Sequence, residues 1–258
     1  MRRKNKSEMI RRLIDFVKAE GSVSVEVAAE MLGVSEVTAR RYLNEIASMD
    51  LPVKRVRGGL VFVETKGSIE AMFEAKLSLN VDEKKRIAEE ALKFVEDGDS
   101  VALDSGTTIF FLARILGKRK GLKVLAVDVK VAEELAKKPD IEVLIACGRV
   151  RNGYFSVGGE MTVEFLERFE VEKTFLSADA IDPEAGVTNS SLFEAKVKET
   201  LARIGKRVVL LADHTKIGKR AFVKAVPLDL IDVIITTKGA DDEVVEELKE
   251  RGIEVRIV

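Results

Sequence analysis

Two short helical patterns separated by one glycine occupy residues 24–46 of this 258-residue chain. The first has apolar residues at positions 25, 28, 29 and 32, which is the spacing of one helix face. Gly33 supplies the left-handed conformation that the corner of a helix-turn-helix unit needs, and Ser35 is a favourable cap for the second helix. In such a unit the second helix enters the major groove of DNA. Its predicted DNA-facing side chains are Ser35, Thr38, Arg40 and Arg41.

Apolar residues further along the second helix are expected to hold it to the domain, and these are Val37, Leu43 and Ile46. An earlier helix, from Ser7 to about Ala19, has apolar positions for packing beneath the pair. The alternative is a small helical hairpin whose arginines are merely solvated. The basic opening stretch of residues 2–6 counts against that alternative and favours a nucleic-acid partner.

A β-hairpin pattern follows the second helix. Segments 53–56 and 60–63 have the pattern of two short strands and are joined through Arg57-Gly58-Gly59. A hairpin at this place would form a wing, whose basic side chains reach the phosphate backbone and add affinity with little sequence information. We place a winged helix-turn-helix domain at residues 1–63, with wing contacts from Lys54, Arg55 and Arg57.

The charge distribution agrees with this division. Residues 1–62 hold 12 Lys and Arg against 8 Asp and Glu, whereas the remainder holds 31 against 36, so a basic head precedes an acidic body. No apolar run approaches the ~20 residues that span a bilayer, and the N-terminus lacks a secretory pattern. The sequence thus predicts a cytoplasmic protein that binds double-stranded operator DNA and contacts no membrane.

From residue 81 onward, amphipathic helices alternate with continuous apolar strands. This alternation predicts an α/β domain over residues 81–258, built on a mostly parallel sheet that is covered on both faces. Residues 64–80 form a linker whose apolar positions suit either a helix that helps to dimerise the chain or one packed on its own domain. Helices are expected at 82–96, 107–116, 130–138, 160–168, 190–204 and 241–251, and strands at 100–103, 123–127, 141–146, 173–178, 207–212, 233–236 and 254–257.

Polar residues follow almost every predicted strand, where parallel sheets bind their ligands. The loop after the first strand, Asp104-Ser-Gly-Thr-Thr108, precedes a helix directly and offers backbone N–H groups and hydroxyls to an anion. Carboxylates at other strand ends suit sugar hydroxyls, and a lysine suits a phosphate, so a sugar-phosphate pocket is predicted. Its candidate residues are Asp104, Ser105, Gly106, Thr107, Thr108, Asp128, Gly148, Arg149, Asp179 and Lys216.

Four other residues bear on the chemistry. His214 is the only histidine, so we expect a loop residue there, no zinc cluster, and neither metal nor cofactor. The single cysteine, Cys147, excludes an internal disulfide and ends an apolar run, so a core position is expected. Glu194 and Lys196 either line the pocket or belong to a solvated helix face.

Motifs of one family run in order through nearly the whole chain, and both halves together are a specific signal. The chain resembles the DeoR family of sugar-responsive transcriptional repressors. The matching segments are Ser35-x-x-Thr38-Ala-Arg40-Arg41-x-Leu43, Arg55-Val-Arg-Gly58-Gly59, Asp82-Glu-Lys84-Lys-Arg-Ile-Ala88, Leu103-Asp-Ser-Gly-Thr-Thr108, Phe175-Leu-Ser-Ala-Asp179-Ala-Ile-Asp182, Gly186-Val-Thr188, Glu194-Ala-Lys-Val-Lys198 and Leu211-Ala-Asp-His-Thr-Lys216-Ile-Gly218.

The resemblance implies a winged helix-turn-helix that binds operator DNA as a dimer or higher homo-oligomer. It also implies a sensor domain similar to ribose-5-phosphate isomerase and CoA transferases, in which the 104–108 loop and Lys216 hold the phosphate of a sugar or polyol and Asp179 faces the sugar. Four residues depart from the family pattern and bear on operator contacts or effector identity: Tyr42 stands for Asp, Arg57 for His, Asp128 for Asn, and Ala180 for Gly.

The strongest alternative is an enzyme, a sugar-phosphate isomerase that carries a DNA-binding head. Such an isomerase needs a carboxylate base and a glycine-rich phosphate loop with lysine after the Asp179 segment. Residues 183–192 lack that lysine and glycine run, although Glu194 remains available as a base. The sequence therefore favours a regulator without catalytic residues.

Overall fold

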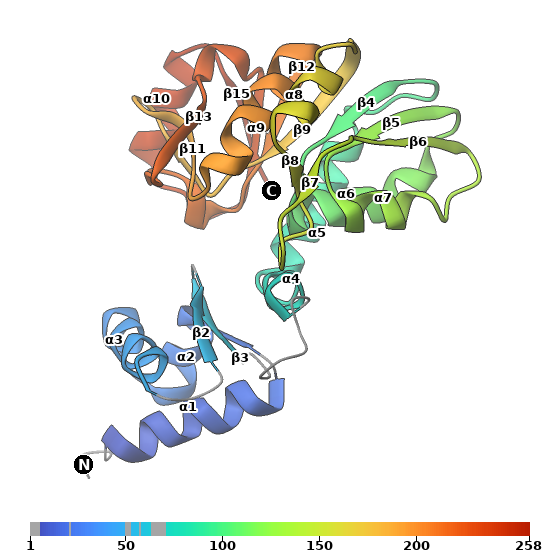
Figure 1. Ribbon diagram of the computed structural model, residues 1–258. Helices are drawn as coiled ribbons and strands as arrows, with labels where there is room; N and C mark the ends of the chain where they lie inside the picture. The colour runs from blue at the N-terminus through green and yellow to red at the C-terminus, as the bar shows by residue number, and fades with distance from the viewer. Residues whose placement is uncertain (1–5, 21, 50–52, 57, 63–70) are drawn as a thin grey trace. The chain divides into compact units, whose positions relative to one another are not determined.

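The computed structural model describes residues 6–20, 22–49, 53–56, 58–62 and 71–258. The chain divides into two compact units, Met1–Leu79 and Asn80–Val258 (Figure 1). The predicted basic stretch at residues 2–5 lies outside the described residues, as does Arg57 of the wing. None of the helices that are described is both long and apolar enough to cross a membrane.

The first unit contains the predicted helix-turn-helix. Gly33 ends the first of the two helices in a left-handed conformation with φ 65°. Ser24 and Ser35 cap the two helices, each accepting a backbone N–H three residues ahead. The elements are α1 (Lys6–Glu20), β1 (Ser22–Ser24), α2 (Val25–Leu32), α3 (Glu36–Ala47), β2 (Val53–Val56), β3 (Gly59–Phe62) and α4 (Ala71–Leu77).

The wing is a three-stranded antiparallel sheet in the order β1-β3-β2, where the sequence predicted a hairpin of two strands. The extra strand β1 has only three residues, Ser-Val-Ser, too few to show a hydrophobic alternation. It connects α1 to α2 and ties the wing to the helices through a Val25 N–H to Gly58 carbonyl bond of 2.8 Å.

The core of the first unit lies between the three helices and the wing. On α3 the buried positions are 39, 42, 43 and 46, which is one helical face. The prediction that Val37 packs inward is wrong, because its side chain is 78% exposed. Val37 lies two positions before the buried Ala39, a rotation of about 200° around the helix. Phe73 and Ala75 of α4 are buried, and α4 contacts β3.

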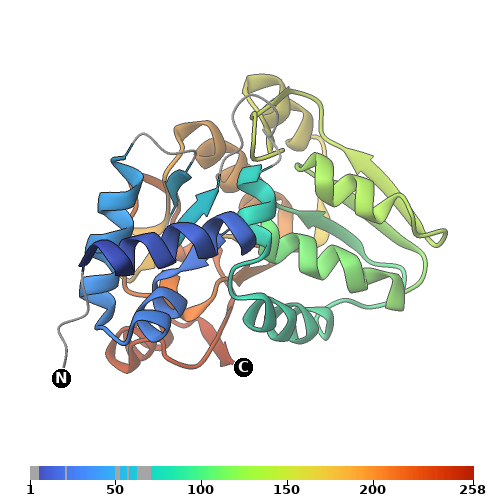
Figure 2. The ribbon, with the colours of Figure 1, turned by 90° about the horizontal axis from the view of Figure 1, so that it is seen from below.

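The second unit is built on a seven-stranded sheet in the order β15-β14-β12-β9-β4-β5-β6, with every pair parallel, as predicted. The chain moves from β4 to β6 in one direction and from β9 to β15 in the other. Right-handed crossovers then place α6 and α7 on one face and α9 on the opposite face. Figures 1 and 2 show the sheet between these helices. The strands are β4 (Ser100–Leu103), β5 (Leu122–Ala126), β6 (Ile141–Ile145), β9 (Val171–Ser177), β12 (Gly205–Leu211), β14 (Val233–Thr236) and β15 (Glu254–Ile257).

The predicted helices of this unit all occur, although the first ends at Leu92 rather than at residue 96. Cys147, which was expected in the core, is exposed because it lies beyond the end of β6. The helices are α5 (Val81–Leu92), α6 (Thr107–Ile115), α7 (Val129–Leu135), α8 (Glu160–Leu166), α9 (Leu192–Ile204) and α10 (Asp242–Glu250), with 3-10 turns η1 (Leu116–Lys118), η2 (His214–Lys216) and η3 (Leu228–Leu230).

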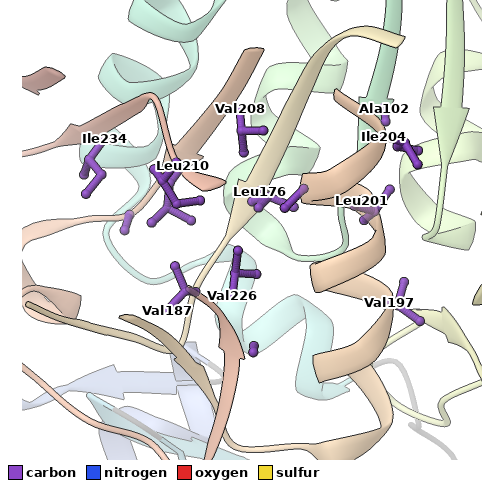
Figure 3. Close-up of a cluster of buried hydrophobic side chains, with 14 of the residues drawn as sticks. Ala102, Leu176, Val187, Val197, Leu201, Ile204, Val208, Leu210, Val226 and Ile234 are labelled. Atoms are coloured by element: carbon purple, nitrogen blue, oxygen red, sulfur yellow. The ribbon is translucent and has the colours of Figure 1, made fainter. Parts of the chain in front are cut away.

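A second, antiparallel sheet in the order β10-β11-β13 was not predicted. Each of its strands has only three or four residues and includes a polar or charged one, so they carry little hydrophobic periodicity. Valines of β11 and β13 nevertheless join the core cluster beside α9 and the main sheet (Figure 3). The remaining strands are β7 (Arg149–Val150), β8 (Val157–Gly158), β10 (Ala180–Asp182), β11 (Gly186–Asn189) and β13 (Val223–Val226).

Candidate DNA-facing surface and anion site

The leading turns of α3 present polar and basic side chains opposite its buried face. Ser35 Oγ lies 3.1 Å from Thr38 Oγ1 at the helix start. Arg40 is exposed and reaches Glu36, one turn back, at 3.1 Å. Arg41 is exposed, with its guanidinium 5.6 Å from the centre of the Tyr42 ring. The helix therefore offers two cations on a surface that its own domain does not cover.

Two of the predicted wing contacts, Lys54 and Arg55, are among the described residues, and they differ in exposure. Lys54 is exposed, whereas Arg55 is partly buried and turned toward α3. Arg55 Nε donates to Asn44 Oδ1 at 2.8 Å, and its Nη1 contacts the carbonyl oxygens of Val56 and Gly59. Burial and the nearby positive charge of Arg40 lower the pKa of Arg55. Arg55 thus links the wing to α3.

In the second unit the chain reverses direction across the sheet between β4 and β9. Loops leave these two neighbouring strands toward opposite sides, and the crevice at such a switch point is where open α/β sheets bind ligands. The predicted loop Asp104–Thr108 follows β4, and Ser177 ends β9. This switch point is the centre of the candidate anion site.

The loop after β4 leads straight into α6. Gly106 is the cap residue and provides no side-chain hydrogen bond to the first turn of the helix. The first-turn N–H groups consequently lack the acceptor that Ser, Thr or Asp supplies at ordinary caps. Ser105 and Thr107 flank Gly106 and are buried, and Thr108 is half-buried. A helix start of this kind attracts an anion through its N–H groups and its dipole.

A buried ion pair supports the loop from below. Lys198 Nζ, on α9, contacts Asp104 Oδ2, and the two side chains are 2% and 1% exposed. Ser177 donates its backbone N–H to Asp104 at 2.9 Å, and its carbonyl oxygen lies 3.1 Å from Lys198 Nζ. Burial alone would lower the pKa of Lys198, but the charges of Asp104 and Glu194 hold it above its ordinary value. Lys198 is therefore charged and paired.

Asp128 is fully buried at the start of α7 and also touches the loop. Its Oδ1 accepts the N–H groups of Lys130 and Val131 at 2.8 and 3.0 Å, and its Oδ2 accepts that of Gly106 at 3.3 Å. Burial raises the pKa of Asp128 to about 6, with a smaller contribution from the charge of Asp104, although the three N–H bonds oppose the shift. The structure thus brings Asp128 to the 104–108 loop.

A second charged group lies around Glu194, near the start of α9. Glu194 accepts hydrogen bonds from Arg151, Ser156 and Asn189 at 2.8, 2.7 and 2.8 Å. Burial would raise the pKa of Glu194, but the charge of Lys198 and the hydrogen bonds from Ser156 and Arg151 lower it. The Arg151 guanidinium lies 3.7 Å from the centre of the Tyr154 ring.

Sequence reasoning missed Lys198, Arg151, Ser156 and Ser177 as site residues. Glu194 and Lys198 are four residues apart on α9 and so share one helix face, a spacing that would have indicated their joint role. No comparable local signal marks Arg151 and Ser156, which reach Glu194 across about forty positions of sequence.

The other predicted effector residues lie at further strand ends. Asp179 Oδ2 accepts the Ser190 N–H at 2.9 Å. Gly148 follows β6, and the exposed Arg149 has its guanidinium 4.9 Å from the centre of the Phe193 ring. Lys216 is half-buried on η2, after β12.

His214, for which the sequence predicted a loop position and no zinc cluster, lies beside two carboxylates. Ligand atoms of Glu83, Asp213 and His214 lie within 4.8 Å of one another. His214 Nδ1 is 3.0 Å from Glu83 Oε2, to which Thr237 donates at 2.6 Å. These hydrogen bonds by themselves account for the arrangement.

A helix-turn-helix that exposes two arginines, on the same chain as a parallel sheet with a candidate anion site, defines the class of DNA-binding regulators with a sensor domain. Residues 10–66 match the family model described as the DeoR-like helix-turn-helix domain, and residues 79–238 match the DeoR C terminal sensor domain. The chain therefore belongs to the DeoR family of transcriptional regulators.

Known proteins that are similar to this chain match it over nearly its full length. The chain is 32% identical over 248 residues to the putative sgc region transcriptional regulator of Escherichia coli K12, covering 96% of this chain and 95% of that protein. It is 27% identical over 245 residues to the glycerol-3-phosphate regulon repressor of the same organism, covering 95% and 96%. Ribose 5-phosphate isomerase A from Methanocaldococcus jannaschii is a solved structure with 19% identity, 54% and 56% coverage and a TM-score of 0.40.

Proposed function

We propose that this chain is an operator-binding repressor of sugar or polyol metabolism genes, released or retained by a phosphorylated sugar. The observation that carries the proposal is the uncapped start of α6 at the strand switch point, on the same chain as a helix α3 that exposes Arg40 and Arg41. The sensing half thus has an anion site, and the other half has a surface for DNA.

In the DNA-binding half, Thr38, Arg40 and Arg41 contact base edges or phosphates from the leading turns of α3, with Ser35 at the helix start. Lys54 contacts the phosphate backbone from the wing. Arg55 positions the wing against α3 through its hydrogen bond to Asn44. The contact of Arg55 with the phosphate backbone of DNA, predicted from the sequence, is proposed in addition. Two half-sites are bound by a homo-oligomer, since one small head buries too little surface for specific binding.

In the sensor half, N–H groups of the 104–108 loop and the hydroxyls of Ser105, Thr107 and Thr108 bind the phosphate, with Lys216 offsetting its second charge. Asp128 and Asp104 shape this loop from behind. The remaining predicted contacts to the sugar come from Asp179, Gly148 and Arg149. A phosphorylated ligand agrees with the name of the glycerol-3-phosphate regulon repressor, to which this chain is similar over nearly its whole length.

We infer that the chain is not an enzyme. The carboxylate that an isomerase would use as its base, Glu194, already accepts three hydrogen bonds and has a lowered pKa, which suits a fixed anion better than a proton acceptor.

Gel-shift titration at two salt concentrations tests the DNA assignment. Arg40→Ala should weaken specific operator binding by about 1–3 kcal/mol if the side chain contacts a base. Lys54→Ala should weaken all sequences alike and flatten the salt dependence by about one unit of slope. Arg11→Ala, which removes an exposed arginine of α1, is the matched control. Unchanged operator affinity in an Arg40→Ala/Arg41→Ala double variant would refute the assignment.

A further inference from the structure

An apolar groove lies between α8 and the first turns of α9. It has a volume of about 420 Å³ and is lined on its apolar side by Val163, Leu192, Phe193 and Val197. Leu192 at its rim is 72% exposed, and Met161 on α8 is 65% exposed. Large apolar side chains gathered at one place on a surface mark an interaction site more often than single ones do.

The groove has a built floor. A Cβ atom at Gly158 would lie 2.7 Å from Phe193 Cε1, so only glycine allows the ring to rest directly on strand β8. Arg149 covers the ring from β7, with its guanidinium 4.9 Å from the ring centre. The Phe193 side chain thus packs from α9 against the β7-β8 hairpin, and this packing gives the groove a defined shape without a partner.

The charges around the groove identify the occupant. Glu160 and Glu164, four residues apart on α8, line one wall, and Lys196 of α9 lines the other. Under a twofold axis, Lys196 of one copy faces the acidic wall of the other, and the same pairs form twice. Lys196 reaches Glu199 at 3.1 Å in its own chain, an exposed pair that contributes little and is easily exchanged.

We propose that the groove between α8 and α9 is a self-association surface, in which a second copy of this chain inserts Leu192 and pairs its charges reciprocally. The two copies of α8 and α9 form one isologous interface. Because α9 carries Phe193 in the groove and Glu194 and Lys198 in the anion site, the interface and the site share the first two turns of one helix. Regulation of the interface by the effector rests on the proposed function, whereas self-association does not.

Sedimentation velocity of the full chain over a range of micromolar concentrations tests the surface. The wild-type chain should self-associate, and Leu192→Glu should weaken association at least tenfold. Ile257→Glu is the matched control, because Ile257 is 46% exposed on β15, an edge strand of the main sheet, and it should have no effect. A monomeric wild-type chain, normal association of Leu192→Glu, or equal weakening by Ile257→Glu would overturn the proposal.

A charge exchange guards against loss of folding in the leucine variant. Lys196→Glu changes an exposed side chain and should weaken association, because three acids then face one another. Glu160→Lys/Glu164→Lys/Lys196→Glu should restore association, since the pattern is again complementary. Failure of the triple variant to recover would count against the twofold arrangement. Operator binding is measured separately, so an associating chain that does not bind DNA would refute the proposed function and leave the interface standing.

Discussion

Replacing Asp128 by asparagine should change how the stability of the second unit depends on pH. Asp128 is buried, and its pKa is raised from 3.8 to about 6 in the folded chain. The folded state therefore binds the proton more tightly than the unfolded state. Above about pH 6 both states are ionised, and the folded state carries the cost of a buried carboxylate. As the pH falls toward 4 the folded state takes up the proton and most of the cost disappears.

The magnitude follows from the two pKa values. Each pKa unit corresponds to about 1.4 kcal/mol, so the full pH-dependent cost of Asp128 is about 3 kcal/mol. An asparagine side chain at this position would not titrate. The free energy of unfolding of Asp128→Asn minus that of the wild-type chain should therefore be about 2–3 kcal/mol larger at pH 7 than at pH 4, so that the variant is relatively more stable at pH 7. Any constant effect of the amide on the Gly106 N–H cancels in this comparison.

Urea titrations followed by circular dichroism at several pH values between 4 and 7.5 measure the difference. Asp140→Asn, which removes an exposed carboxylate in the loop before β6, is the control and should not alter the pH dependence. A stability difference between Asp128→Asn and the wild-type chain that stays constant with pH would refute the reasoning, because the burial of an ionised carboxylate would then carry no measurable cost.

Three further outcomes are expected. Lys198→Met should lower the free energy of unfolding by about 3–5 kcal/mol because it leaves Asp104 buried without its cation, and adding Asp104→Asn should recover most of the loss in urea titrations. Arg55→Lys should weaken operator binding in gel shifts by about 1 kcal/mol, since an ammonium cannot replace the guanidinium contacts to α3 and the wing, whereas Lys54→Arg should change little. Lys216→Ala should abolish the effector response and retain operator binding. Calorimetry of the wild-type chain against a panel of sugar phosphates and the parent sugars measures the contribution of the phosphate. Equal affinity for a sugar and its phosphate would contradict the assignment of the site.

Local signals in the sequence identified much of the fold. Ser24, Gly33 and Ser35 fix the helix-turn-helix corner because capping and left-handed turns depend on a few neighbouring residues. The alternation of apolar strands and amphipathic helices sufficed for the parallel sheet. The strands β1 and β10 were not predicted because three residues are too few to establish a period of two.

The candidate site was less accessible to such reasoning. Strand-end rules located the 104–108 loop and Asp128, because the carboxyl ends of parallel strands gather at one edge. They gave no reason to place Lys198 beneath Asp104, 94 positions earlier in sequence. Val37 was predicted to pack inward because it is apolar, but the periodicity of α3 points that position to solvent.

The charge balance of the anion site sets Asp128 apart from the other acids. Asp104 is paired with Lys198, and Glu194 with Arg151, so these four charges cancel. Asp128 is different, since its described partners are backbone N–H groups, one of them from the loop proposed to hold phosphate. An ionised Asp128 would repel a phosphate there. With a pKa of about 6, its protonation at pH 7 costs only about 1.4 kcal/mol, less than several charge-assisted hydrogen bonds return. Phosphate binding at this loop should therefore draw a proton onto Asp128, a coupling that an asparagine at the same position would lack.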